Sequence, residues 1–382
     1  MVVEGLDLSA FEEPLKARGS TPGRAATDPK VLVALWLYAA TAGVGSGREL
    51  ARLCVYHSAY RWLCGGVSVS YHTLNDFRVG HEKALDELIT QVLAMLIQHG
   101  VVSVRRVSED GVRVRASAGS SSFRRRETLQ EQLVEVRVHV QALKRQMDAV
   151  SASRQQAARA RALRAKQRRL EAALEELPKI ESARAASKHQ PSEDRPPRAS
   201  STDPEARVMR MGAGGFRPAY NVQLATDTKS RAIVGVDVTN AGTDANQATP
   251  MREQVEQRSG CKVQEQLVDG GYVTLEEIQR TTDAGTTMYA PVPEPKGTAS
   301  RYTPRKTDSE GVAAWRRLMG TPEGQETYKL RCSTSETVNA DLCEHRGMRQ
   351  FKVRGLHKVR CVVLWLALAY NLMHFAEVLV AQ

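Results

Sequence analysis

Residues 265–272 have the pattern of a buried β-strand that ends at a carboxylate, Asp269, with Gly270 and Gly271 directly after it. A sheet holds such a side chain in place, and bare backbone beside it leaves room for a phosphate. Metal-assisted phosphoryl transfer needs both features, because hard cations take oxygen ligands. The pattern therefore predicts a rigid sheet with a metal-binding acid at the end of one strand. We expect Asp110 and Glu336, distant in the chain, to complete the site.

The chain of 382 residues is basic, with 54 Lys and Arg residues against 43 Asp and Glu residues and a formal net charge of +11. Its length allows about two or three domains and a sizeable core. A positive excess suits a polyanionic partner such as nucleic acid, although many basic proteins bind none. Charge alone therefore leaves DNA binding open.

The 6 cysteines are scattered and form no C-x-x-C pair, which favours a reducing, intracellular location over a disulfide framework. Cys54, His57, Cys64 and His72 are zinc-type ligands, but their spacing fits no common finger. No signal peptide is visible at the N-terminus. The apolar stretch 361–372 is too short to span a bilayer, so we expect a buried helix there and no membrane contact.

Residues 1–100 predict a helical domain. Capping residues mark helix starts at Asp28, Ser46 and Thr73. Short helices joined by glycine turns resemble a helix-turn-helix DNA-binding arrangement, here with four basic side chains, Arg48, Arg52, Arg61 and Arg78. A small helical packing domain is the alternative interpretation.

Residues 101–122 change to the pattern of a β-strand and place Asp110 and Gly111 among valines. A strand at this point would hold Asp110 on a rigid element. The alternative is a hairpin turn, which is the commonest use of an Asp-Gly pair.

Residues 123–186 predict a long helical insertion that resembles a coiled coil. Apolar residues alternate spacings of four and three, as in a heptad seam, at Leu129, Leu133, Val136, Val140, Leu143, Met147 and Val150. We expect either one long helix or a hairpin that reverses near 151–153, packed against itself or against a second copy. Its arginine-rich middle could lie along DNA or face solvent. Residues 187–206 are expected to be a linker, because prolines interrupt regular structure.

Residues 207–382, together with 101–122, predict the catalytic core. Alternating strands and helices follow one another at 220–226, 232–239, 246–258, 262–268, 275–281, 287–292, 315–319, 326–338 and 358–380. This order predicts an α/β fold with a ribonuclease-H-like mixed sheet. The whole chain would then consist of this core, the helical N-terminal domain and the long helical insertion.

Several short runs in the chain form an ordered set, at 201–207, 214–221, 236–240, 268–272 and 328–336. Together with the basic segments 346–347 and 354–360, they resemble insertion-sequence transposases of the DDE class. The run 328–336 resembles the tyrosine–arginine–glutamate signature of these enzymes. The resemblance extends from about residue 27 to the end of the chain.

The resemblance implies roles for individual residues. The catalytic and metal-binding positions, which suit two Mg²⁺ or Mn²⁺ ions, fall on Asp110, Asp269 and Glu336. Contacts to DNA phosphates fall on Tyr328, Arg331, Arg346, Arg354 and Lys358. Such enzymes carry a lysine about two helical turns after the glutamate. Cys343 stands at that position here, which leaves this contact unassigned.

The resemblance implies a transposase that binds the ends of its mobile element and performs metal-dependent strand cleavage and strand transfer. It would act as a homodimer on double-stranded DNA, in the cytoplasm with the nucleoid. One alternative is a related nuclease that cuts without joining strands. Another is a decayed or truncated relative that only binds DNA, which the cysteine at position 343 motivates. A coiled-coil scaffold would account only for the insertion.

Overall fold

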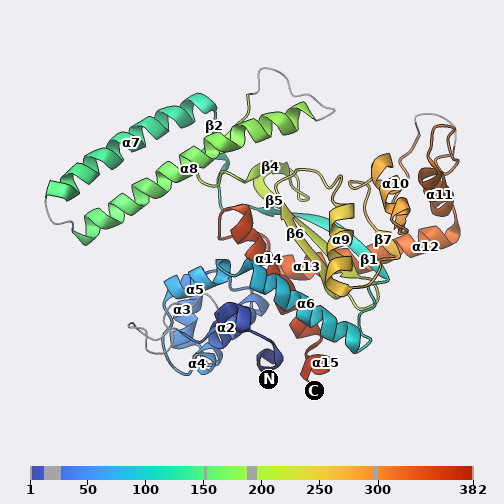
Figure 1. Cartoon of the computed structure of the whole chain (residues 1–382), viewed down its shortest axis with the longest axis horizontal. Helices are drawn as coiled ribbons and strands as arrows, with labels where there is room; N and C mark the ends of the chain where they lie inside the picture. The colour runs from blue at the N-terminus through green and yellow to red at the C-terminus, as the bar shows by residue number, and fades with distance from the viewer. Residues whose placement is uncertain (1, 13–26, 150–152, 187–195, 296–299, 381–382) are drawn as a thin grey trace. The chain divides into compact units, whose positions relative to one another are not determined.

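A computed structural model describes residues 2–12, 27–149, 153–186, 196–295 and 300–380 (Figure 1). The chain forms two compact units. The first unit comprises Met1–Val114, Asn221–Gln350 and His357–Gln382. The second comprises Arg115–Tyr220 and Phe351–Leu356. The helical segment 1–100 therefore belongs to the same unit as most of the sheet and is not a unit of its own.

A curled, mixed sheet forms the centre of the predicted core. Its strands lie in the order β4-β5-β1-β7-β8, and β6 also pairs with β5. The bounds are β1 Arg106–Arg115, β4 Arg207–Arg210, β5 Phe216–Asp227, β6 Ile233–Thr239, β7 Glu265–Leu267 and β8 Thr287–Tyr289. The pairs β1–β7 and β7–β8 are parallel, whereas β4–β5 and β5–β6 are antiparallel. This mixed α/β arrangement is compatible with a ribonuclease-H-like core.

Strand β1 is continuous over 10 residues, so Asp110 and Gly111 lie inside a strand and not in a hairpin turn. The predicted hairpin is confirmed as β5 and β6, which pair from Asn221↔Thr239 onward. The predicted helices after it are also confirmed, as α9 (Ala248–Ser259) and α10 (Leu275–Asp283). Helix α9 packs against β6 and against the N-terminal helix α6 (Glu82–Gln98).

The N-terminal segment is helical, as predicted. After η1 (Val2–Gly5) its helices are α1 Ser9–Glu12, α2 Pro29–Thr41, α3 Gly47–Tyr56, α4 Ser58–Leu63, α5 Tyr71–Val79 and then α6. The Asp28 carboxylate accepts from the Lys30 amide, and the Ser46 hydroxyl accepts from the Glu49 amide, which confirms two predicted starts. The start predicted at Thr73 is wrong. Ser70 caps α5 by accepting from the His72 amide, because it offers the same side-chain oxygen three residues earlier.

Helix α14 (Leu356–His374) is a core helix, as expected for the apolar stretch. By length and composition it could cross a membrane, but 72% of its apolar window is buried inside the protein. Trp365 donates from Nε1 to the Arg78 carbonyl at 3.1 Å and packs against the rings of Phe11 and Phe77. The helix therefore joins the N-terminal helices to the sheet, where Asn371 bonds both backbone groups of Ile233.

The elements that follow β8 in the first unit are helices. Its helices are α11 Glu310–Met319, α12 Pro322–Arg331, a π-helix Cys332–Glu336, α13 Thr337–Glu344 and, after α14, α15 Ala376–Val380. Val312, Trp315 and Met319 of α11 pack with β7, β8 and α10 in one apolar cluster. The π-helix was not expected, since the sequence predicted one uninterrupted helix over 326–338.

The insertion in the second unit is a helical hairpin of α7 (Arg126–Ala149) and α8 (Arg154–Ala185). Of the two predicted alternatives, one long helix or a hairpin, the structure has the hairpin. Apolar residues of both helices form a common core, which contains Leu129, Leu133, Val136, Leu170, Ala173, Leu177 and Ile180. The predicted reversal lies mostly outside the described residues, as does Val150. The capping box of Ser153 and Gln156 starts α8. The seam is thus filled within the chain and needs no second copy.

Part of the predicted linker is ordered and buried. Strand β3 (Ala199–Ser200) pairs antiparallel with β2 (Phe123–Arg124), after the 3-10 turn η2 (Ser120–Ser122). Asp203 is buried and accepts from the Tyr220 hydroxyl at 2.7 Å and the Gly355 amide at 3.1 Å. The linker prediction is therefore wrong for residues 199–206, because these polar groups have partners far away in the chain. The proline at position 191 lies outside the described residues.

Candidate active site

The sheet brings Asp110 and Asp269 together. Strands β1 and β7 are parallel neighbours, and their register pairs Ser108 with Leu267. Asp110 and Asp269 each lie two residues beyond that pair. Side chains two apart on a strand share a face, so Asp110 lies on the same face of β1 as Ser108. The two predicted acids therefore occupy matching places on adjacent chain segments.

The π-helix brings Glu336 to the same face. The Ser335 hydroxyl is buried and hydrogen-bonds the Ser108 hydroxyl. One turn later, Asn339 donates from Nδ2 to Oδ2 of Asp110 at 2.9 Å. A π-helical turn holds an extra residue, and such turns are frequent at functional sites. Here the turn carries both Ser335 and Glu336, so Glu336 lies between the two residues that contact β1, and its side chain is half-exposed.

Arg331 lies between the carboxylates. Its Nη2 is 2.8 Å from Oε1 of Glu336, and its Nη1 is 3.4 Å from Oδ1 of Asp110. Tyr328 is also close enough to Arg331 for each to shift the pKa of the other, and the Asp269 carboxylate acts electrostatically on Tyr328. Tyr328 and Arg331, the two residues of α12 that the family resemblance indicates, therefore lie near all three acids. Because the guanidinium lies between two of them, the three acids do not form a compact ligand trio among the described residues.

The charges at this site oppose one another. Burial raises the pKa of Asp110 to about 6, the Arg331 cation lowers it, and the Asp269 carboxylate raises it again. Burial lowers the pKa of Arg331. Asp110, Tyr328 and Glu336 together raise it by more than burial lowers it, so the net shift is upward. The site therefore has surplus negative charge that a cation would stabilise.

Asp244 is a fourth acid at the site that sequence reasoning missed. It is buried, and it accepts hydrogen bonds from Asn221 at 2.6 Å, Gln223 at 2.8 Å and Arg113 at 2.9 Å. A β-carbon at Gly111 would collide with its Oδ1. A β-carbon at Gly271 would lie 3.3 Å from its Oδ2 and 3.0 Å from Oδ1 of Asp269. These glycines therefore allow Asp244 to approach both β1 and the segment that follows β7. Its only sequence signal is an acid shortly after a strand.

Glu109, next to Asp110 on β1, is fully buried. Nε2 of Gln266 donates to it at 2.9 Å. Burial raises the pKa of Glu109 well above its usual range, although the Gln266 hydrogen bond lowers it and the Glu277 carboxylate raises it. Burial therefore favours the protonated form of this core acid.

The other predicted phosphate contacts differ in exposure. Arg346 is buried, pairs through Nε with Oδ2 of Asp341 at 2.6 Å and lies over the Tyr370 ring. Lys358 is exposed in the first unit, and Arg354 is exposed in the second unit, where its Nε donates to the Ser117 carbonyl. A cysteine has no cationic form, so Cys343 cannot supply the positive charge of a lysine, and burial raises the pKa of its thiol.

The basic side chains of the N-terminal segment also differ in their exposure to solvent. Arg48, Arg52 and Arg61 are exposed. Arg78 is buried, stacks on Trp36 and donates to the Gly45 carbonyl at 2.7 Å. It is therefore a packing residue and not a surface contact. The four possible zinc ligands of this segment do not form a compact trio among the described residues.

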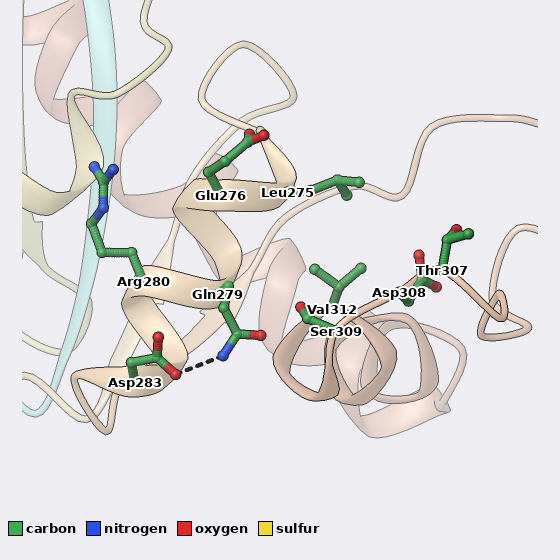
Figure 2. Close-up of a pocket in the computed structure, with 9 residues that line it drawn as sticks. All are labelled: Leu275, Glu276, Gln279, Arg280, Asp283, Thr307, Asp308, Ser309 and Val312. Carbon is green, nitrogen blue, oxygen red and sulfur yellow. Dashed lines mark hydrogen bonds between the residues drawn. The ribbon is translucent and has the colours of Figure 1, made fainter.

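A groove of about 480 Å³ lies between α10 and the start of α11 (Figure 2). It contains none of the predicted site residues. Its lining includes three acids and one arginine, and the lining residues are Leu275, Glu276, Gln279, Arg280, Asp283, Thr307, Asp308, Ser309 and Val312. Gln279 donates to Asp283 at 2.6 Å, as Figure 2 shows. A net negative lining does not favour a DNA phosphate.

Two family models match the chain. One, described as "Transposase domain (DUF772)", matches residues 2–79, and the other, described as "Transposase DDE domain", matches residues 293–376. The chain is a relative of insertion-sequence transposases of the DDE class. Comparisons with curated proteins and with solved structures gave no match.

The transposase matches cover only part of the site. Tyr328, Arg331 and Glu336 lie inside the matched DDE segment, whereas Asp110 and Asp269 lie outside both matched segments. Enzymes of this family act on DNA and generally use divalent metal ions. The observation that brings the two aspartates together is the register of β1 and β7, which does not depend on the family matches.

Proposed function

We propose that this transposase binds the ends of its mobile element and carries out metal-dependent cleavage and transfer of DNA strands at Asp110, Asp269 and Glu336. The observation that carries the proposal is the parallel register of β1 and β7, which puts two acids side by side. The π-helix adds a third acid to the same face of β1. A ribonuclease-H-like core, proposed for this mixed sheet, is consistent with that layout.

The donor set of the site consists of carboxylate oxygens, which suits a hard cation such as Mg²⁺ or Mn²⁺. Asp110, Asp269 and Glu336 would hold the metal, and two ions are proposed. When bound, such ions activate the attacking oxygen and stabilise the leaving oxygen. Asp110 has a rigid position inside β1, and Asp269 lies two residues after β7, where its Oδ1 accepts from the Gly271 amide. Glu336 is half-exposed on the π-helix and is the ligand most able to move.

Arg331 and Tyr328 are proposed to act on the DNA phosphate. The guanidinium is shared between the Asp110 and Glu336 carboxylates. A planar guanidinium fits two phosphate oxygens, so Arg331 can exchange its carboxylate partners for the phosphate at the cut. Tyr328 lies beside Arg331 and would contact the same phosphate. Lys358 and Arg354 remain proposed phosphate contacts, whereas the buried Arg346 is better explained as a support for α13 and α14.

The proposed surface for end binding is the corner of α3 and α4. Tyr56 is 83% exposed and Trp62 is 80% exposed, next to the exposed Arg52 and Arg61. The sequence has no Asp or Glu between Glu49 and Asp76. Exposed aromatic rings among arginines, without carboxylates, suit a polyanion that also offers flat base or sugar surfaces. A helix-turn-helix mode of binding remains a proposal.

Substitution of Trp62 with alanine should weaken binding of end DNA about 10-fold, because base or sugar contacts with an aromatic ring are lost. Trp62→Phe should keep most of the affinity. Arg61→Ala should weaken binding and reduce the slope of log affinity against log salt by about one. Fluorescence anisotropy with labelled end DNA measures both effects. Leu275→Ala, in the acidic groove, is the control and should bind as the wild type does. Equal binding by Trp62→Ala would contradict the proposed surface.

The activity is tested with DNA that carries the sequences flanking the coding region. We expect strand cleavage in Mg²⁺ or Mn²⁺ and none in EDTA. Pre-cleaved ends should be joined to a target plasmid. Cleavage without joining would establish the nuclease alternative. Binding without cleavage in either metal would establish a protein that only binds DNA.

A homodimer and a place in the cytoplasm with the nucleoid are further parts of the proposal. Two element ends must be held together during transposition, which favours a dimer. The heptad seam no longer supports it, because α7 and α8 bury the seam against each other. A dimer interface would therefore use another surface.

A further inference from the structure

Three side chains of metal-ligand type meet away from the proposed catalytic acids, where α6 begins and α14 passes. They are Glu82, His357 and Cys361, and their ligand atoms all lie within 4.8 Å of one another. All three belong to the first unit. His357 and Cys361 are four residues apart on α14, so they lie on the same face of that helix. Glu82 is the first residue of α6.

The hydrogen bonds of His357 determine which ring nitrogen carries a proton. Nε2 lies 3.1 Å from the Val79 carbonyl oxygen, which can only accept, so Nε2 carries the proton. Nδ1 faces Oε2 of Glu82. In the neutral ring, Nδ1 is then an acceptor opposite a carboxylate, which is also an acceptor. A second proton between them resolves this, as does a metal ion that takes the place of the proton while the two side chains move apart.

Cys361 favours the metal ion. Its side chain is completely buried, and its thiol donates a long hydrogen bond to the same Val79 carbonyl at 3.7 Å. A proton shared by His357 and Glu82 would not involve this sulfur, whereas a metal ion would bind all three groups. A histidine that binds metal usually donates its other N–H to a carbonyl or carboxylate. The Val79 carbonyl meets that requirement here.

The surroundings leave one side open for a fourth ligand. Arg360 Nε lies 3.2 Å from Oε1 of Glu82, so it fixes the carboxylate and leaves Oε2 for the metal. A hollow of about 240 Å³ adjoins Glu82 and Arg360. The His357 side chain is 57% exposed, so water can reach the site. Three protein ligands and a water make the tetrahedral set that zinc prefers.

We propose that Glu82, His357 and Cys361 form a binding site for a zinc-type divalent cation. One sulfur, one nitrogen and one oxygen ligand suit zinc and differ from the oxygen-only set of the catalytic acids. The site joins the start of α6 to α14 and so connects the N-terminal helices to α14. It is independent of the proposed strand cleavage.

Cobalt(II) tests this site in the full-length protein, because it replaces zinc and absorbs light through its bound ligands. After purification in EDTA and removal of the chelator, the wild type should bind about one equivalent of cobalt. A thiolate-to-cobalt charge-transfer band in the near ultraviolet should appear and should disappear when zinc is added. Cys361→Ser should lose this band, and His357→Ala should lose tight binding. Cys261→Ser, half-buried elsewhere in the unit, is the matched control and should keep both.

Absence of the band in the wild type would overturn the proposal, as would an equal band in Cys361→Ser. Thermal unfolding gives a second measurement that does not depend on the cysteine variant. Zinc in slight excess should raise the Tm of the wild type relative to EDTA, because it binds the folded chain. His357→Ala should show no zinc-dependent rise. The same Tm for the wild type in zinc and in EDTA would mean that His357 is simply a protonated partner of Glu82.

Discussion

Replacement of Asp269 with asparagine should reduce metal-dependent cleavage of end DNA by about 10³-fold or more, with DNA binding unchanged. The amide has nearly the same shape, and its oxygen can still accept from the Gly271 amide, as Oδ1 of Asp269 does at 2.7 Å. It lacks the charge that a hard cation requires. Loss of one preorganised electrostatic group typically costs about 10²–10³ in rate, and a metal ligand is at the upper end. Single-turnover cleavage in Mg²⁺ and anisotropy with end DNA measure the two effects.

The control for this experiment is Asp283→Asn, because Asp283 is an exposed acid on α10 of the same unit. It should cleave and bind as the wild type does. Cleavage by Asp269→Asn at a tenth of the wild-type rate or more would remove Asp269 from the catalytic site. A failure of both cleavage and end binding in a variant with a wild-type circular dichroism spectrum would contradict the separation of the two functions.

The position of Asp269 was predictable because its signals are local. An apolar strand followed by an acid and two glycines indicates a strand end with open backbone, and β7 is found there, although it is shorter than predicted and ends at Leu267, two residues before Asp269. The hairpin of β5 and β6 and the helix α9 were predictable for the same reason, since alternation and capping act over a few residues. That Asp110 would lie beside Asp269 depended on the strand order, which only the fold-class prediction supplied.

The remaining parts of the site depend on contacts between distant segments. Asp244 is held by Asn221, Gln223 and Arg113, which come from two different strands. No local pattern reports such a cluster. Asn339 gave no signal either, because its partner, Asp110, is 229 positions away in the chain.

Exposure of arginines was also unpredictable from sequence. Arg78 resembled a DNA contact, but Trp36 and the Gly45 carbonyl hold it inside the helical segment. Arg346 matched a basic family segment, yet Asp341 and the Tyr370 ring bury it. A charged side chain is buried only where such partners meet it, and tertiary structure decides where that is.

The heptad seam shows a different limit. Its spacing predicted correctly that a narrow apolar stripe would be buried, but spacing does not identify the surface that covers the stripe. Helix α8 covers it by folding back on α7. The expectation of a second copy of the chain at this seam therefore has no support from the structure.

Replacement of Asp110 with asparagine should stabilise the metal-free protein at pH 8 while removing a proposed catalytic acid. Burial holds the pKa of Asp110 at about 6, against an ordinary value of 3.8. Above pH 6 the carboxylate is charged in both the folded and unfolded chains, and the folded chain bears the cost of burying it. That difference in pKa corresponds to about 3 kcal/mol of unfolding free energy, so we expect a gain of about 1–3 kcal/mol.

The gain should depend on pH with a defined sign. Below about pH 4 the Asp110 carboxyl is protonated in both states, so the variant and the wild type should differ little there. The difference should grow as the pH rises from about 3.8 to about 6, the pKa values of the unfolded and folded chains, and then remain constant. Urea unfolding in EDTA at about pH 3 and about pH 8, on either side of that window, measures it, with Asp283→Asn as the control. Mg²⁺ should raise the stability of the wild type at pH 8 more than that of Asp110→Asn, because only the wild type has the buried charge that the cation neutralises. A variant less stable than the wild type at pH 8 would show that the Arg331 and Asn339 contacts outweigh the cost of burial, and the surplus negative charge inferred for this site would then be wrong.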